Sequence, residues 1–231
     1  MTFRPSLVAV LLSLGTLLSA ACAPTSQLLE DYTPLADVSE LTLDESELPT
    51  LIFKRDGAPG LDAYDRFIID PVRISYTDPE MEELSVEQVA EMQAYLRDEL
   101  VDELESAGYT VGTRSEVGTL RLSFTIVGLR AGDAGGAANI ATMAAGTATG
   151  VPAIFVISTG EVTVECEFRD AYRNRLEAVA IERSKGSTWL NDTPWSTWAD
   201  VRNSFDQWAR GIREAVDEAH RKAALRGKSA F

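Results

Sequence analysis

Three carboxylates have the residue type and spacing that come closest to a catalytic arrangement. Glu165 and Glu167 alternate along a predicted hairpin over residues 161–181, and Glu182 follows the hairpin directly. Two carboxyl groups on either side of a substrate can act as general acid and base, as in glycoside hydrolysis. Arginines are interleaved with them at Arg169, Arg173, Arg175 and Arg183. This interleaving favours cross-strand ion pairs, so we assign no catalytic residue and keep a carboxylate-dependent hydrolase as an alternative.

A thiol nucleophile is the second chemistry that the residue types allow. Cys166 lies in the same predicted hairpin, but a nucleophilic cysteine needs a base close to it in space. The sole histidine, His220, falls in a basic helical tail, so we interpret Cys166 as a small core residue. The glycines of residues 131–150 lack the spacing and the following lysine of a phosphate loop. The sequence therefore predicts no metal site and no cofactor.

Cys22 is the cysteine whose surroundings predict a modification. An apolar run over residues 7–18 follows Arg4, and small residues precede the cysteine, which is the layout of a secretory signal. The run is shorter than the roughly 20 residues of a spanning helix. Residues 18–22, Leu-Ser-Ala-Ala-Cys, resemble the bacterial lipobox, with Ser19 where a branched apolar residue is usual. The resemblance implies that residues 1–21 are removed and Cys22 is acylated; a secretory signal with an incidental cysteine is the alternative.

An acylated Cys22 would hold the mature protein on a membrane, since such a cysteine carries the several acyl chains that stable anchoring needs. Ala23 follows it instead of Asp, which in Gram-negative lipoproteins implies sorting to the outer membrane. We therefore expect a lipid-anchored protein on the periplasmic face of the outer membrane. Cys166 is then the only thiol left, so no intramolecular disulfide is expected.

The composition limits the partners and the number of domains. A net charge of −15 works against binding to nucleic acid or to anionic lipid head groups. Residues 22–50 are polar and acidic without a sustained period, which predicts a flexible tether. Its apolar residues Tyr32, Leu35, Leu41 and Leu43 could instead lie along the domain surface. Residues 51–231 suffice for a single domain, with a Gly/Ala-rich insert at 131–150 that is a loop, a small-residue helix or a segment that orders on a partner.

Two amphipathic helices are predicted. The first begins after Ser85, which forms a capping box with Gln88, and ends at Gly108. Its apolar stripe is Val89, Met92, Leu96, Leu100 and Leu104, and its charged face has no metal-ligand spacing. The second, near the C-terminus, has a wide stripe to pack on a sheet: Trp198, Val201, Phe205, Trp208, Ile212, Ala215 and Ala219. Trp189 and Trp195, in the loop before it, have less reason to be buried and are assigned to partner binding.

Strand-forming residues occupy positions 64–76, 109–113, 119–127 and the hairpin. Pro71 cannot donate a ladder hydrogen bond, so the first strand lies at an edge or carries a bulge. Alternation places Leu120, Leu122, Phe124 and Ile126 on one face. On the returning hairpin strand it places Leu176, Ala178 and Ala180 on one side and Glu177, Val179 and Ile181 on the other. The predicted fold is α+β in two layers, a mostly antiparallel sheet of about five strands with both helices on one face and one possible parallel crossover.

Four stretches resemble a bacterial lipoprotein family known as domain of unknown function 3313. They are residues 64–72, 120–125, 160–171 and 198–209, which run in order across the mature chain behind the lipobox. The resemblance implies an envelope lipoprotein and transfers no catalytic residues. The hairpin turn of the family often contains Thr-Gly where this chain has Tyr172-Arg173, so its geometry can differ here.

Three hypotheses about function follow. The first is a non-enzymatic module that binds an envelope protein or a cell-wall component. The second is the hydrolase of envelope glycans, which requires two of Glu165, Glu167 and Glu182 to converge in a pocket. The third is a structural spacer without a specific ligand.

Overall fold

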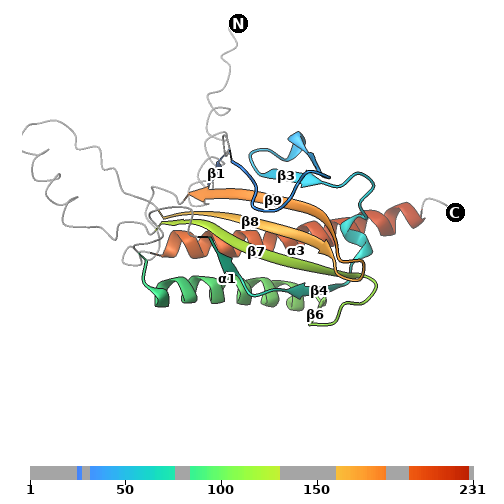
Figure 1. Ribbon diagram of the computed structural model, residues 1–231. Coiled ribbons are helices and arrows are strands. Elements are labelled where there is room, and N and C mark those ends of the chain that lie inside the picture. The colour runs from blue at the N-terminus through green and yellow to red at the C-terminus, as the bar shows by residue number, and fades with distance from the viewer. Residues whose placement is uncertain (1–24, 28–31, 76–83, 131–159, 186–197, 229–231) are drawn as a thin grey trace, which may run out of the picture.

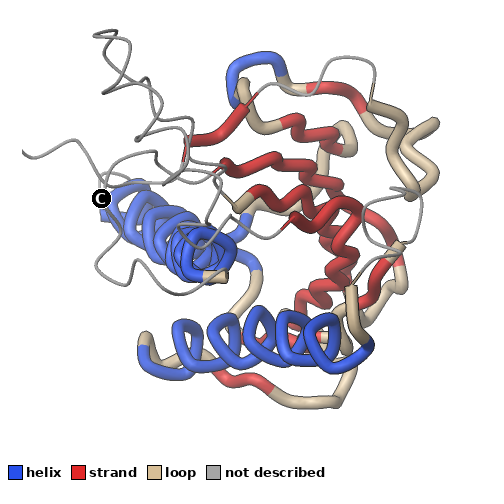
Figure 2. Tube along the Cα trace, turned by 90° about the vertical axis from the view of Figure 1, so that its left-hand side faces the viewer, coloured by secondary structure: helices blue, strands red, loops and turns tan. Residues whose placement is uncertain are grey.

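A computed structural model describes residues 25–27, 32–75, 84–130, 160–185 and 198–228. In this part of the chain a curved sheet of nine strands carries two long helices on one face (Figures 1 and 2). The helices are α1 (Val86–Ser106) and α3 (Ala199–Lys228), and two short 3-10 helices are η1 (Glu45–Glu47) and η2 (Leu61–Ala63). The fold class is α+β, as predicted.

The strands are short at the margins of the sheet and long at its centre. Their bounds are β1 Thr25–Gln27, β2 Thr42–Leu43, β3 Leu51–Lys54, β4 Arg66–Ile69, β5 Arg73–Ile74, β6 Thr110–Val111, β7 Thr119–Arg130, β8 Glu161–Asp170 and β9 Arg175–Lys185. The order across the sheet is β2-β3-β9-β8-β7-β4-β6, with β1 beside β9 and β5 beside β7. The three long strands therefore form the antiparallel centre, and every other strand is added to its margins.

The prediction of about five mostly antiparallel strands is only partly right. Strands β4 and β5 run parallel to β7, and β6 runs parallel to β4, so the sheet is mixed. Helix α1 lies between β5 and β6 along the chain and provides the parallel crossover that the sequence permits. The strands that were missed, β1, β2 and β3, have two to four residues each, which is too few for a period to be recognised.

Pro71 interrupts the first predicted strand. The interruption leaves β4 before it and β5 after it, and both pair with β7. Strand β6 pairs only with residues 66 and 67, so the chain around Pro71 has β7 as its single neighbour among the described strands. Three residues lie between Ile69 and Arg73 but only two between their partners on β7, Leu122 and Thr125, so the prediction of an edge or a bulge is confirmed.

The main core lies between the sheet and the two helices. The capping box of Ser85 and Gln88 is formed, and all five stripe residues of α1 are buried. Gly108 has a φ of 90°, a left-handed conformation that ends the helix. Leu120, Leu122, Phe124 and Ile126 pack on the same core from β7. The predicted helix boundaries and the facing of β7 are confirmed.

The opposite face of the sheet is covered by the N-terminal segment. A second apolar cluster joins Val179 and Ile181 of β9 to Tyr32, Val38 and Leu41. Residues 32–50, which the sequence assigns to a flexible tether, thus lie against the domain and contribute β2 and η1 to it. The folded chain begins well before residue 51. The signal segment and residues 131–150 lie outside the described residues.

Candidate functional site: a groove between the sheet and α3

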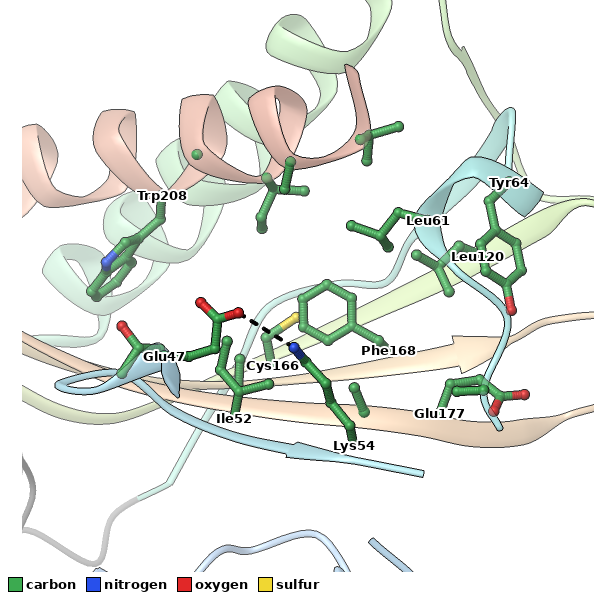
Figure 3. Close-up of a pocket in the computed structure, with 18 of the residues that line it drawn as sticks. Glu47, Ile52, Lys54, Leu61, Tyr64, Leu120, Cys166, Phe168, Glu177 and Trp208 are labelled. Carbon is green, nitrogen blue, oxygen red and sulfur yellow. Dashed lines mark hydrogen bonds and ion pairs between the residues drawn. The ribbon is translucent and has the colours of Figure 1, made fainter. Parts of the chain in front are cut away.

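A groove of about 940 Å³ lies between the middle of α3 and the part of the sheet formed by β3, β7, β8 and β9 (Figure 3). Helix η2 and Tyr64 stand at one end of it, and Glu47 and Trp208 at the other. Its walls are mainly apolar and include Ile52, Leu61, Leu120, Phe124, Val164, Cys166, Phe168, Ala178, Ala180, Trp208, Ile212 and Ala215. The volume is within the range of pockets that hold small ligands.

Helix α3 is attached to the domain at two points that flank the groove. In its first half, the Ser204 hydroxyl donates a buried hydrogen bond of 2.8 Å to the Ser184 hydroxyl of β9. In its second half, His220 Nε2 donates to the carbonyl oxygen of Tyr64 at 2.9 Å. The groove residues of α3 fall between these two attachments, so the helix spans the groove as a fixed wall.

The apolar stripe of α3 divides between the core and the groove. Trp198, Val201 and Phe205 are buried in the core, as predicted. Further along, Ala209 and Val216 continue the core, whereas Ile212 and Ala215 line the groove. Ile212 still packs against the core, but Ala215 is exposed, so the expectation that the whole stripe packs on the sheet is wrong at Ala215. The physical reason is the absence of an opposing side chain, since the sheet there presents the small residues Ala178 and Ala180.

Gly211 widens the groove on the helix side. It is exposed and lines the groove, and a Cβ built on it would meet no atom within 4 Å. Glycine is unfavourable in the interior of a helix, so its occurrence at this position leaves space at the cost of helix stability.

A β-bulge in β9 determines which residues face the groove. Phe168 pairs with Ala178, but the next residue, Arg169, pairs with Leu176, so Glu177 is the extra residue. The bulge reverses the alternation: Leu176 joins the second cluster on the far face, and Glu177 lines the groove. The predicted alternation is therefore wrong before residue 178, because a bulge leaves no mark in the apolar pattern.

Glu177 and Tyr64 form a buried polar end to the groove. Both side chains are almost fully buried, at 4% and 3% exposure. Glu177 Oε1 accepts a hydrogen bond of 2.8 Å from Arg175 Nε, whereas Glu177 Oε2 and the Tyr64 hydroxyl have no hydrogen-bond partner among the described residues. Burial, followed by the charges of Asp170 and Glu177, raises the pKa of Tyr64 to about 12, so its hydroxyl keeps its proton at neutral pH.

The three carboxylates proposed for a hydrolase do not converge. Glu165 is buried under the N-terminal segment, where it accepts hydrogen bonds from Leu35 N at 2.8 Å and Ala36 N at 2.7 Å. Glu182 lies on the opposite face of the sheet, in the groove. The requirement of that hypothesis, two of these carboxylates in one pocket, is not met by the described residues.

All four interleaved arginines form ion pairs, but only Arg183, which contacts Glu161 of β8 at 3.3 Å, pairs across neighbouring strands as predicted; the other three pair within their own strand or turn. Glu167 contacts Arg169 at 2.9 Å and Arg73 at 3.1 Å. Arg175 pairs with Glu177, and Arg173 pairs with Asp170 across the hairpin turn at 2.7 Å. The turn occupies residues 171–174 as predicted, with Asn174 in the left-handed region at a φ of 51°.

Cys166 is a wall residue of the groove. It is buried, and burial raises the pKa of its thiol well above the usual value, so the thiol is neutral. His220 is engaged with the Tyr64 carbonyl and stacks near Tyr109, with ring centroids 5.9 Å apart. Among the described residues no group of three or more His, Cys, Asp or Glu side chains could hold a metal ion.

Several predicted site residues lie outside the described part of the chain, namely Cys22, Trp189 and Trp195. Sequence reasoning also missed Tyr64 and Glu177, because a strand residue and a bulge residue give no motif. None of the described helices is long and apolar enough to cross a bilayer.

Comparisons with known proteins complete the description. Similar solved structures include the PelC dodecamer from Paraburkholderia phytofirmans, at 12% identity and a TM-score of 0.40, with 71% of this chain and 97% of that chain covered. Protein XCC0632 from Xanthomonas campestris is similar at 10% identity and a TM-score of 0.43, with coverage of 74% and 94%. A minor lipoprotein from Acinetobacter baumannii is similar at 10% identity and a TM-score of 0.36, with coverage of 66% and 92%.

No curated protein matches the chain significantly. A family model described as a protein of unknown function, DUF3313, matches residues 24–212. This match covers most of the chain and agrees with the resemblance found in the sequence. The chain belongs to the DUF3313 family.

Proposed function

We propose that the protein is a lipid-anchored envelope lipoprotein whose domain is a non-enzymatic binding module, and that the groove between α3 and the sheet is its ligand site. The groove is the observation that supports this most strongly. Apolar side chains line a space of about 940 Å³ between the described elements. Interiors are normally close-packed, and exposed apolar surface of this kind typically marks a binding site.

The anchor is inferred from the sequence. Residues 18–22 resemble a lipobox, and Ala23 after Cys22 favours the outer membrane over the inner membrane. Acylated Cys22 would place the domain at a membrane surface, where molecules with aliphatic chains are concentrated. An apolar groove next to a membrane has such molecules as its natural ligands.

A non-enzymatic role is supported by the chemistry of the groove. Its thiol is neutral, and of the three carboxylates predicted for a hydrolase only Glu182 lines it, since Glu165 and Glu167 are not among its lining residues. Binding of a protein or cell-wall partner through Trp189 and Trp195 stays a separate prediction. Crosslinking from Trp195 in intact cells, followed by identification of the captured molecule, tests it.

The groove is tested by filling it from the helix side. Gly211→Leu introduces a side chain into the groove while raising helix propensity, so the fold should be retained. Gly211→Ala is the matched control, because it improves the helix and adds only a methyl group. The purified mature chain is titrated with N-phenyl-1-naphthylamine, an apolar dye whose fluorescence rises on burial.

We expect the native chain and Gly211→Ala to bind the dye, and Gly211→Leu to bind it at least tenfold more weakly. Circular dichroism should show the same helix content in all three proteins. Absence of binding to the native chain, or equal binding to Gly211→Leu, would contradict the proposed ligand site.

A further inference from the structure

The polar end of the groove has two hydrogen-bonding atoms that the protein does not satisfy. The Tyr64 hydroxyl and Glu177 Oε2 are buried without a hydrogen-bond partner in the described part of the chain, and both side chains lie at the same end of the groove (Figure 3). A buried polar group without a partner destabilises a fold by an amount comparable to a lost hydrogen bond. Two of them at one end of an apolar groove indicate a position prepared for a ligand group.

The backbone is arranged to bring Glu177 to this position. Without the bulge, Glu177 would alternate with Ala178 and face the second cluster with Val179 and Ile181. Bulges re-aim side chains, and they are frequent next to functional sites. Arg175 Nε holds the other carboxylate oxygen at 2.8 Å, which fixes the carboxylate and offsets its charge. The unpartnered Oε2 is thus the acceptor left available.

The two atoms have complementary roles. The Tyr64 hydroxyl is protonated at neutral pH and can donate, whereas the Glu177 carboxylate can only accept. A ligand hydroxyl fits both, because it accepts from Tyr64 and donates to Glu177. A ligand carboxylate can accept from Tyr64 but cannot donate, and it is repelled by Glu177. Both oxygens are covered in the structure, so contact with a ligand requires a side-chain movement at this end of the groove.

We propose that the groove binds a single-chain amphiphile with an uncharged, hydroxyl-bearing head, of the monoacylglycerol class, whose aliphatic chain lies along α3 and whose hydroxyl is held by Tyr64 and Glu177. The inference rests on the proposed function, since it names the ligand class of the same groove. The walls formed by Leu61, Phe168 and Ile212 supply the apolar contact for the chain.

The experiment compares two probes with the same twelve-carbon chain and different heads. Monododecanoylglycerol and dodecanoate compete for the bound dye on the purified mature chain at pH 8. We expect the glycerol ester to bind at least tenfold more tightly than dodecanoate, because only the ester can donate to Glu177.

Two variants separate recognition from folding. Tyr64→Phe should weaken binding of the ester about fivefold, as expected for one hydrogen bond of roughly 1 kcal/mol. It should leave the melting temperature unchanged or higher, because it removes an unsatisfied buried hydroxyl. Glu177→Gln should weaken binding of the ester and strengthen binding of dodecanoate, so the affinities of the two probes become more similar. Tyr172→Phe, in the exposed turn, is the control and should change neither the affinity for the ester nor the affinity for dodecanoate.

The outcomes distinguish this inference from the function on which it rests. If both probes displace the dye equally and Tyr64→Phe has no effect, the head-group assignment is wrong while the groove remains a ligand site. If neither probe nor the dye binds the native chain, the proposed function fails as well.

Discussion

Glu165 is the residue that fastens the N-terminal segment to the sheet. Its carboxylate accepts hydrogen bonds from the backbone amides of Leu35 and Ala36 and from the Tyr32 hydroxyl, the last at 3.2 Å. Burial of Tyr32, together with the nearby charge of Glu165, raises the pKa of the tyrosine. A buried carboxylate is tolerated here because all three donors satisfy it.

Replacing Glu165 should therefore loosen the segment. We expect Glu165→Ala to destabilise the protein by about 2 to 3 kcal/mol, because it leaves buried amides without acceptors. Urea unfolding measures the change, and limited proteolysis should cut within residues 32–41 faster than in the native chain. Glu167→Ala, which breaks only partly exposed ion pairs, is the control and should cost less than about 1 kcal/mol. Equal effects of the two variants would refute this role of Glu165.

Asp217 makes the free energy of unfolding depend on pH in the acid range. The Tyr109 hydroxyl donates to it at 2.7 Å and Arg213 at 2.8 Å, and the hydrogen bond from Tyr109 is the main reason that its pKa is lowered. The Asp217 carboxylate binds a proton less tightly in the folded state than in the unfolded state. Its contribution to the free energy of unfolding is therefore fully present above the ordinary pKa of aspartate. It is lost as the pH falls through the lowered value.

Tyr109→Phe should reduce this acid dependence. Melting temperatures measured between pH 2.5 and pH 7 should fall less steeply below about pH 4 in the variant than in the native chain. At pH 7 the variant should be less stable, since the hydrogen bond between the end of α1 and α3 is lost. Parallel curves for both proteins would exclude Asp217 as a contributor.

At the level of elements, the long periodic segments were predictable and the short or irregular ones were not. Helix α1 and strand β7 repeat their apolar residues over several turns or alternations, so the pattern alone fixes their type and buried face. The bulge at Glu177 and the docking of residues 32–41 depend on partners far away in the sequence. For this reason the groove was absent from the sequence-based prediction. The contact of the N-terminal segment with the domain was foreseen only as a possibility, and it is formed by Tyr32 and Leu41 but not by Leu35 and Leu43, which are exposed.

Two glycines test how α3 sits on the sheet. Gly160 donates its backbone N–H to Asp200 Oδ2 at 3.1 Å, and a Cβ on Gly160 would lie 3.1 Å from the Cβ of Asp200. Gly211, at the groove, has no such neighbour. We expect Gly160→Ala to destabilise the protein by about 1 to 3 kcal/mol through overpacking, and Gly211→Ala to stabilise it by up to about 1 kcal/mol. Chemical denaturation measures both, and destabilisation by Gly211→Ala would show that the groove is closed there.

For the whole molecule, the position of β1 determines how a lipid anchor would hold the domain. Thr25 pairs with Lys185 at the end of β9, in one row with Glu161 and Arg130 of the neighbouring strands. Only two residues, Ala23 and Pro24, separate Cys22 from Thr25, so the two Cα atoms are at most about 11 Å apart. An acylated Cys22 would therefore keep this end of the sheet at the membrane surface, in place of the long tether that the composition suggests.

The two ends of β9 should then differ in their distance from the lipid. Lys185 lies at the anchored end, whereas Tyr172 lies in the turn beyond the other end, about 30 Å away along the strand. Fluorophores attached to Lys185→Cys and Tyr172→Cys in membrane-bound protein should differ in their quenching by nitroxide-labelled lipids, with strong quenching only at position 185. The buried, neutral thiol of Cys166 should not react with the label. Cys22→Ser should release the protein from the membrane and abolish the quenching. If Cys22→Ser releases the protein but positions 185 and 172 are quenched equally before release, the anchor is supported and the placement of this end of the sheet at the membrane is contradicted. If Cys22→Ser stays on the membrane, the anchor itself is contradicted.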